Sequence, residues 1–218
     1  MYITASAGWL NSAFCFFYQC ITLAVHQLYE FGGVVFTPFM ELISLLGKGG
    51  IFLIFLSLVL MFLKKTRRFG TAMAFGLLIG ALFVNLFLKV VIARPRPYAD
   101  EASIYYPLWV MMGQHMESDF SFPSGHTNAA FAAMVPLFLL GDKKKSWLAI
   151  VFGVLMGISR IYLVVHFPSD VLGGLITGTL AGMIGTLIAI NLPKKWYTWD
   201  LLPGRKKGDE EECLDSES

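Results

Sequence analysis

Three clusters of charged and polar residues interrupt a chain that is otherwise strongly apolar. They are Lys89 with Arg96-Pro97, the run Pro123-Ser124-Gly125-His126, and Ser159-Arg160 with His166 and Asp170. Charged side chains beside hydrocarbon are costly, and their presence there by default marks a functional site. These three clusters are therefore the candidates for the chemistry of this chain.

The cations of the clusters suit an anionic ligand that carries phosphate. Lys89, Arg96 and Arg160 can neutralise the charge on phosphoryl oxygens, and an arginine fork matches two such oxygens at once. Ser124 and Gly125 stand where a helix begins, so we expect their backbone N–H groups, helped by the helix dipole, to cradle an anion. All five residues are predicted to bind the phosphate of a substrate.

Two histidines offer the groups that a covalent phosphoryl transfer needs, a nucleophile for phosphorus and an acid for the leaving oxygen. His166 has Asp170 four residues later. A carboxylate that holds the far ring nitrogen fixes the tautomer and stabilises the charged ring. We predict that His166 is the nucleophile, Asp170 its orienting partner and His126 the general acid. No acidic or Cys/His cluster of metal-binding form accompanies them, so neither a metal nor another cofactor is expected.

The composition is that of a membrane protein. Of the 218 residues, 56% are hydrophobic and only 15% are charged, which is outside the usual range for soluble domains. Five apolar runs are interpreted as membrane spans, at residues 49–63, 69–88, 124–140, 147–165 and 170–192. The predicted fold is all-α: a polytopic membrane helical bundle of five transmembrane helices plus an N-terminal helical segment.

The parts outside these spans have distinct compositions. Residues 1–48 are apolar but broken by polar residues, glycines and Pro38, which favours helices lying in the membrane interface, although residues 9–29 are long enough to cross. Residues 49–192 form the expected core, with residues 98–122 as a cap over the site. Residues 193–218 are expected to be a solvated, disordered, charged tail. The three cysteines have neither disulfide nor metal spacing.

The basic residues divide between the two sides of this topology. Alternation of the five spans places twelve of the seventeen on one side, which the positive-inside rule assigns to the cytoplasm together with the C-terminus. The other five are Lys48, Lys89, Arg94, Arg96 and Arg160. Basic residues on the disfavoured side need a reason, and an anionic ligand supplies one. The site is therefore expected at the extracytoplasmic face of the cell membrane.

Each cluster taken alone has a simpler interpretation. Lys89 and Arg96 could anchor lipid headgroups, Pro-Ser-Gly-His could be only a capped helix start, and His166 with Asp170 could be a surface hydrogen bond. The order of the three clusters along the chain and their predicted position on the same side of the membrane favour one joint site. His26 and His115 lack such company and are interpreted as interfacial or loop histidines. Tyr105, Tyr106, Trp109 and Tyr162 are expected to form an aromatic belt at the interface.

The three clusters resemble the three-part signature of the type 2 phosphatidate phosphatase (lipid phosphate phosphatase) superfamily. In chain order they read Lys89-x6-Arg96-Pro97, Pro123-Ser124-Gly125-His126 and Ser159-Arg160-x5-His166-x3-Asp170. This superfamily includes bacterial undecaprenyl diphosphate phosphatases and soluble vanadium haloperoxidases. The resemblance covers residues of about 50 to 192. It implies a helical bundle, a site facing the outer leaflet, and metal-independent hydrolysis through a phosphohistidine. It also implies the residue roles given above, with a supporting role for Ser159.

By this resemblance the expected substrate is a lipid phosphate drawn from the bilayer, with undecaprenyl diphosphate first and phosphatidylglycerol phosphate or phosphatidate as alternatives. The implied function is an integral-membrane lipid phosphatase. The alternative of another class is a phospholipid-binding or transport module without turnover, and vanadate-dependent oxidation is a third. Neither nucleic acid nor an obligate protein partner is expected.

Overall fold

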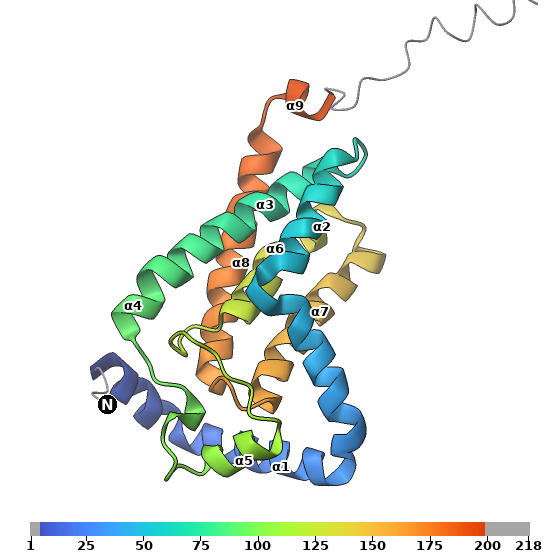
Figure 1. Ribbon diagram of the computed structural model, residues 1–218. Helices are drawn as coiled ribbons and strands as arrows, with labels where there is room; N and C mark the ends of the chain where they lie inside the picture. Colours follow the sequence, from blue (N-terminus) through green and yellow to red (C-terminus); the bar gives the residue numbers. More distant parts are fainter. Residues whose placement is uncertain (1–4, 199–218) are drawn as a thin grey trace, which may run out of the picture.

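The structure is a computed structural model that describes residues 5–198 of the 218. In this range the regular elements are helical (Figure 1). They are α1 (Ala5–Gly47), the 3-10 turn η1 (Lys48–Gly50), α2 (Ile51–Phe62), α3 (Arg67–Ala81), the π-helical segment η2 (Leu82–Leu88), α4 (Lys89–Ile92), the 3-10 turn η3 (Pro97–Ala99), α5 (Tyr105–Met111), α6 (Gly125–Leu140), α7 (Lys143–Tyr162), α8 (Pro168–Asn191) and α9 (Lys194–Thr198). Cys213 and the acidic end of the tail lie outside the described residues.

The prediction of an all-helical membrane bundle is confirmed. Four helical stretches are long and apolar enough to cross a bilayer, and α6 is a shorter apolar helix. The four stretches are Phe16–Phe62, Arg67–Ala99, Lys143–Tyr162 and Pro168–Asn191. A helix satisfies its own backbone hydrogen bonds, which is what a chain in hydrocarbon requires. The expected spans therefore appear as helices, with ends shifted by a few residues.

Helix α1 has two parts. Its backbone leaves helical geometry at Gly32, and Pro38 lies within the second part. The first part lies across one end of the bundle, and the second turns upward and leads through η1 into α2 (Figure 1). An orientation of the first part in the membrane interface stays a prediction.

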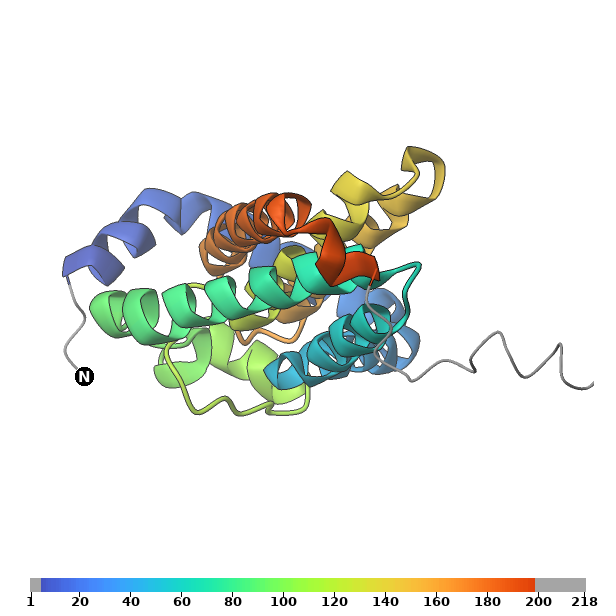
Figure 2. The same ribbon diagram turned by 90° about the horizontal axis from the view of Figure 1, so that it is seen from above.

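Helix α6 lies in the middle of the bundle and contacts α3, α7 and α8 (Figure 2). The close approach of these helices to one another depends on glycines. A Cβ atom at Gly185 of α8 would lie 2.4 Å from the carbonyl oxygen of Ala72, and one at Gly76 of α3 would lie 2.5 Å from that of Ala132. Small residues that let backbones approach are typical of membrane helix interfaces. The central helices are therefore held at fixed distances, which fixes the residues at their ends.

Two expectations are wrong in part. The tail begins with an ordered helix, α9, in which the indole nitrogen of Trp196 donates a 3.1 Å hydrogen bond to the hydroxyl of Thr71. Trp109 and Tyr162 are 7% and 1% exposed and belong to a buried apolar cluster with Met112. They are core residues and not part of a lipid-facing aromatic belt.

Candidate active site

The three polar clusters meet at one end of the bundle. Lys89 begins α4, Arg96 follows it, His126 lies in the first turn of α6, and His166 lies between α7 and α8. All four side chains line one cavity of about 640 Å³, as does Gly125. The α4–η3 connection and the α7–α8 turn, which carry Arg96 and His166, lie at the end of the bundle opposite α9 and the α2–α3 turn (Figure 1). The structure thus brings together residues that the sequence separates by up to 77 positions.

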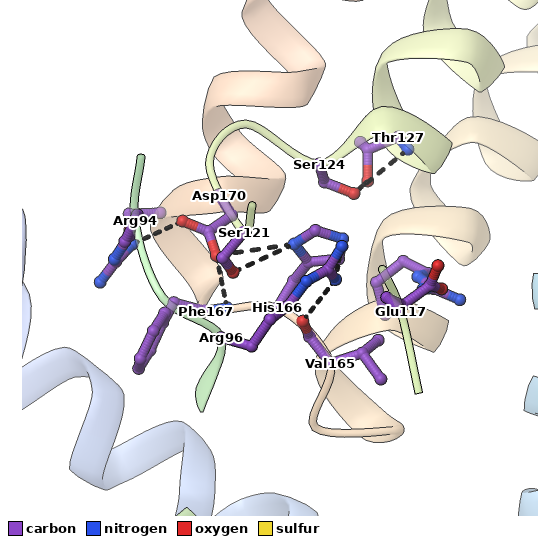
Figure 3. A network of polar contacts seen from close by, with 12 residues as sticks. Arg94, Arg96, Glu117, Ser121, Ser124, Thr127, Val165, His166, Phe167 and Asp170 are labelled. Atoms are coloured by element: carbon purple, nitrogen blue, oxygen red, sulfur yellow. Dashed lines mark hydrogen bonds and ion pairs between the residues drawn. The ribbon is translucent and has the colours of Figure 1, made fainter. Parts of the chain in front are cut away.

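The His166 ring is almost completely buried, at 3% exposed, and both of its nitrogens face polar groups. Its Nδ1 is 3.6 Å from Oδ2 of Asp170, and its Nε2 is 3.1 Å from the guanidinium NH1 of Arg96 (Figure 3). Burial, with the adjoining Arg96 and Arg160 cations, holds the pKa of His166 well below 6.5. A neutral ring with its proton on Nδ1 fits these contacts, and neutrality is what a nucleophile needs.

Ser121 is a site residue that the sequence analysis missed. Its hydroxyl donates to Oδ2 of Asp170 at 2.5 Å and lies 3.4 Å from Nδ1 of His166. The backbone N–H of Phe167 donates to the same carboxylate oxygen at 2.9 Å. The hydroxyl therefore bridges carboxylate and imidazole across a separation too long for a direct hydrogen bond. Its only sequence signal is its place two residues before Pro123.

All three predicted phosphate-binding cations are paired with carboxylates from the segment expected to cap the site. Lys89 and Arg96 form ion pairs with Asp119, and Arg160 pairs with Glu117. The cation side chains are 3–7% exposed, whereas the Asp119 side chain is 47% exposed. A carboxylate and a phosphate offer oxygens of the same charge and geometry to such a clamp. Asp119 and Glu117 thus stand where phosphate oxygens are expected.

Asp119 is charged at any ordinary assay pH. Burial raises the pKa of its carboxyl, but hydrogen bonds and charge from Lys89 and Arg96 outweigh burial and lower it below 3.8. A phosphate can reach these cations only by displacing a charged carboxylate. No such competition is evident from sequence, because the carboxylates lie 23 to 43 positions away from the cations they pair with.

Ser124 and Gly125 play different parts from one another. The backbone N–H of Ser124 donates to the carbonyl of Asp170 at 2.9 Å, and its hydroxyl accepts from the Thr127 N–H at 3.4 Å. The Ser124 N–H is therefore engaged within the protein and its hydroxyl caps α6, and the binding of phosphate by Ser124 stays a prediction. Gly125 lines the cavity, where a Cβ would lie 3.5 Å from the Lys89 amine.

His126 and Ser159 complete the predicted set. His126 lines the cavity beside Gly47, where a Cβ atom would lie 2.9 Å from the His126 ring, so a glycine here leaves space for the imidazole. Ser159 donates its hydroxyl hydrogen bond to the Met156 carbonyl of its own helix at 2.7 Å. The Ser159 hydroxyl is therefore engaged within α7, and its supporting role at the site stays a prediction.

Arg94 is a further buried charge, which the sequence analysis counted among the outer-face basic residues explained by an anionic ligand without giving it a specific role. It is fully buried, and its guanidinium forms an ion pair with Oδ1 of Asp170. The sequence did offer one signal for Arg94. The Arg-Pro pair is repeated in Arg94-Pro95-Arg96-Pro97, on the predicted extracytoplasmic side, where basic residues are few.

A model of the PAP2 superfamily matches residues 66–194 of this chain. The chain is 32% identical to undecaprenyl-diphosphatase BcrC of Bacillus subtilis over 49% of this chain and 51% of that protein. It is 29% identical to an undecaprenyl-diphosphatase of Sulfolobus acidocaldarius over 72% of each chain. A crystal structure of a PAP2-type phosphatidylglycerolphosphate phosphatase from Bacillus subtilis superimposes with a TM-score of 0.57 and 26% identity, covering 84% of this chain and 98% of that one.

Proposed function

The chain belongs to the PAP2 superfamily, among its metal-independent membrane lipid phosphatases, and on that premise we propose that it removes a phosphate from a lipid diphosphate. Undecaprenyl diphosphate is the first candidate substrate. The reaction runs through a phosphohistidine on His166, at the extracytoplasmic face of the cell membrane.

The proposal rests on the 640 Å³ cavity described above, here called the main cavity, which has a polar lining at one end and an apolar lining at the other. One end holds Lys89, Arg96, His126 and His166, and the cavity continues between α2 and α3. There it is lined by Ile54, Leu58, Leu77, Leu78 and Ala81. Ile54, Leu58 and Leu78 are 41–55% exposed on the surface that meets lipid. A substrate with phosphate at one end and hydrocarbon at the other fits such a lining, because each half meets matching chemistry.

The choice among lipids rests on the relatives. Two proteins named as undecaprenyl-diphosphatases favour a polyprenyl diphosphate. The structural similarity to a phosphatidylglycerolphosphate phosphatase keeps phosphatidylglycerol phosphate as the second candidate, with phosphatidate beside it.

The first chemical step follows from the contacts of His166. Its Nε2 bonds to phosphorus while the bond from phosphorus to the leaving oxygen breaks, and His126 gives that oxygen a proton. Lys89, Arg96 and Arg160 neutralise the charge on the three phosphoryl oxygens. The Ser121 hydroxyl accepts from the Nδ1–H of His166 and donates to Asp170, which fixes the ring with Nε2 toward the cavity.

The second step returns the enzyme to its starting state. A water gives its proton to His126 and attacks phosphorus, the bond from phosphorus to Nε2 breaks, and inorganic phosphate leaves. His166 is again neutral and His126 again protonated, so the two steps together consume one water.

A non-catalytic phospholipid-binding module is the rival from another class. Binding alone has no use for a buried neutral imidazole whose far nitrogen faces a carboxylate at 3.6 Å. The cations of the site, without the histidine, would hold a phospholipid headgroup equally well. The His166–Asp170 arrangement therefore favours turnover.

The orientation and domain division complete the proposal. The positive-inside rule puts the α9 end in the cytoplasm and the cavity on the outer side. Residues 1–48 form an N-terminal segment, 49–192 the phosphatase core with a cap at 98–122, and 193–218 a cytoplasmic tail.

The test is phosphate release from the purified chain on undecaprenyl diphosphate, phosphatidylglycerol phosphate, phosphatidate and a soluble phosphomonoester, each with excess chelator. We expect release from lipid phosphates that chelator does not reduce, and fastest release from the diphosphate. A preference for the soluble ester would overturn the lipid substrate, and a strict need for magnesium would overturn the metal-independent route.

A further inference from the structure

From the buried contacts of Arg94, together with the first part of α1, we infer that Arg94 is a positioning residue for the nucleophile. It fixes Asp170 and Ser121, which in turn hold His166. The inference rests on the proposed function and gives that site a residue and a chain segment that the phosphate chemistry does not use.

The Asp170 carboxylate divides its two oxygens between two tasks. Oδ2 faces His166, Ser121 and the Phe167 N–H, whereas Oδ1 faces the Arg94 guanidinium (Figure 3). Both the Asp170 and Arg94 side chains are 0% exposed. A buried carboxylate free to rotate would offer either oxygen to the imidazole. An ion pair on Oδ1 leaves Oδ2 as the oxygen that His166 meets.

Arg94 also holds the hydroxyl that bridges carboxylate and imidazole. The backbone carbonyl of Arg94 accepts a 2.8 Å hydrogen bond from the N–H of Ser121. The side chain of Arg94 donates to the hydroxyl of Ser169, next to Asp170, at 2.7 Å. One residue thus sets the positions of both groups that contact Nδ1 of His166.

The guanidinium is in turn fixed by α1 and by an aromatic ring. Its NH2 donates to the Tyr18 hydroxyl at 3.1 Å and to the side-chain oxygen of Asn11, and its central carbon lies 3.9 Å from the centre of the Phe167 ring. Asn11 and Tyr18 are seven residues apart, which puts them on one face of a helix. The first part of α1, which lies across the bundle, therefore closes the compartment around Arg94.

Arg94 stands apart from the groups that bind phosphate. It does not line the main cavity, whereas Arg96, two residues later, does. Replacing both partners of a buried ion pair by apolar residues is often neutral, whereas removing one partner is strongly destabilising, so the folding of Arg94→Met has to be checked beside its activity. Loss of Arg94 should therefore lower the rate of the chemical step and leave phosphate affinity nearly unchanged.

The experiment compares Arg94→Met, Arg94→Lys and the control Arg68→Met, an exposed arginine at the other end of the bundle. For Arg94→Met we expect kcat to fall about 100-fold or more, since orienting a catalytic imidazole is worth up to about 10⁴-fold in a triad. KM and the Ki of inorganic phosphate should stay within about threefold, because uniform binding is untouched. Arg94→Lys should recover part of kcat, and Arg68→Met should match the wild type.

A double-mutant cycle tests whether Arg94 acts through Asp170. In an Asp170→Asn background, adding Arg94→Met should change kcat by less than about threefold, since residues that act as a unit are strongly non-additive. Wild-type kcat in Arg94→Met, or full additivity with Asp170→Asn, would overturn the inference.

Two further measurements distinguish a failure of this inference from a folding defect and from a failure of the proposed function. If Arg94→Met fails to fold, Tyr18→Phe decides: a lower kcat with unchanged KM supports the inference, and an unchanged kcat overturns it. If the wild type releases no phosphate, or His166→Ala retains activity, the proposed function fails. An active wild type, an inactive His166→Ala and a fully active Arg94→Met would sink the role of Arg94 alone.

Discussion

Replacing Asp119 by asparagine should tighten the binding of phosphate. In the structure the Asp119 carboxylate pairs with both Lys89 and Arg96, so an incoming phosphate must first displace it. Asparagine keeps the size of the side chain but removes its charge. The displacement then costs less, and the difference appears as a lower Ki for inorganic phosphate as a competitive inhibitor.

The size of the effect follows from the exposure of the pair. A hydrogen bond to a charged group contributes about 1.5–3 kcal/mol when buried, and an exposed ion pair only about 0.2–1 kcal/mol. The Asp119 side chain is 47% exposed and its partners are 6–7% exposed, so we take roughly 1–2 kcal/mol for the two contacts together. That range corresponds to a Ki for phosphate about 5- to 30-fold lower.

The assay measures inhibition of lipid phosphate hydrolysis by inorganic phosphate, with Glu101→Gln as the matched control. Glu101 is an exposed carboxylate in the same segment, and it does not line the main cavity. Its replacement makes the same change in net charge, so it should leave Ki within about twofold, as expected of an exposed charge away from the cations. A Ki for Asp119→Asn that is unchanged, or that rises, would refute the competition between carboxylate and phosphate.

Three further predictions concern the nucleophile and the bundle. His166→Ala should abolish phosphate release while the protein still folds, because His166 is the cavity-lining histidine whose Nδ1 faces a carboxylate; residual turnover near the wild-type rate would contradict this. On the acid side of the pH profile, kcat/KM should fall as pH drops through a pKa below 6.5, because the nucleophile must be unprotonated and the pKa of His166 is lowered by burial and by Arg96; an acid-side midpoint above 6.5 would count against it. Gly185→Leu should lower the thermal unfolding temperature, since a Cβ there would lie 2.4 Å from the Ala72 carbonyl and overpacking costs about 1–3 kcal/mol or more. Gly8→Leu, at a position with open space, should not.

Local spacing made part of the site predictable. His166 and Asp170 are four residues apart, and Lys89 and Arg96 flank one helix end, so their proximity follows from short stretches of chain. Apolar runs likewise predicted the helices, because hydrocarbon leaves a chain few alternatives.

Contacts between distant segments were not predictable in the same way. Arg94 meets Asp170 across 76 positions, and Ser121 meets it across 49. No local pattern encodes such a pair. Tyrosine and tryptophan suit either an interface or a core, so only packing decided that Trp109 and Tyr162 are buried.

The π-helical segment Leu82–Leu88 has a consequence for the spacing between α3 and the site. A π-helical turn holds one more residue between its hydrogen-bonded groups than an α-helical turn does. Lys89 comes directly after this segment. Over Leu82–Leu88 the wider turns therefore absorb about one residue more than an α-helix of the same rotation would hold. If these seven residues adopted α-helical geometry, Lys89 would rotate by roughly one residue's turn, about 100°, away from Gly125. Removing one residue would restore α-helical geometry and leave Lys89 close to its present direction, so the π-helical segment is what keeps the lysine of this chain in the clamp.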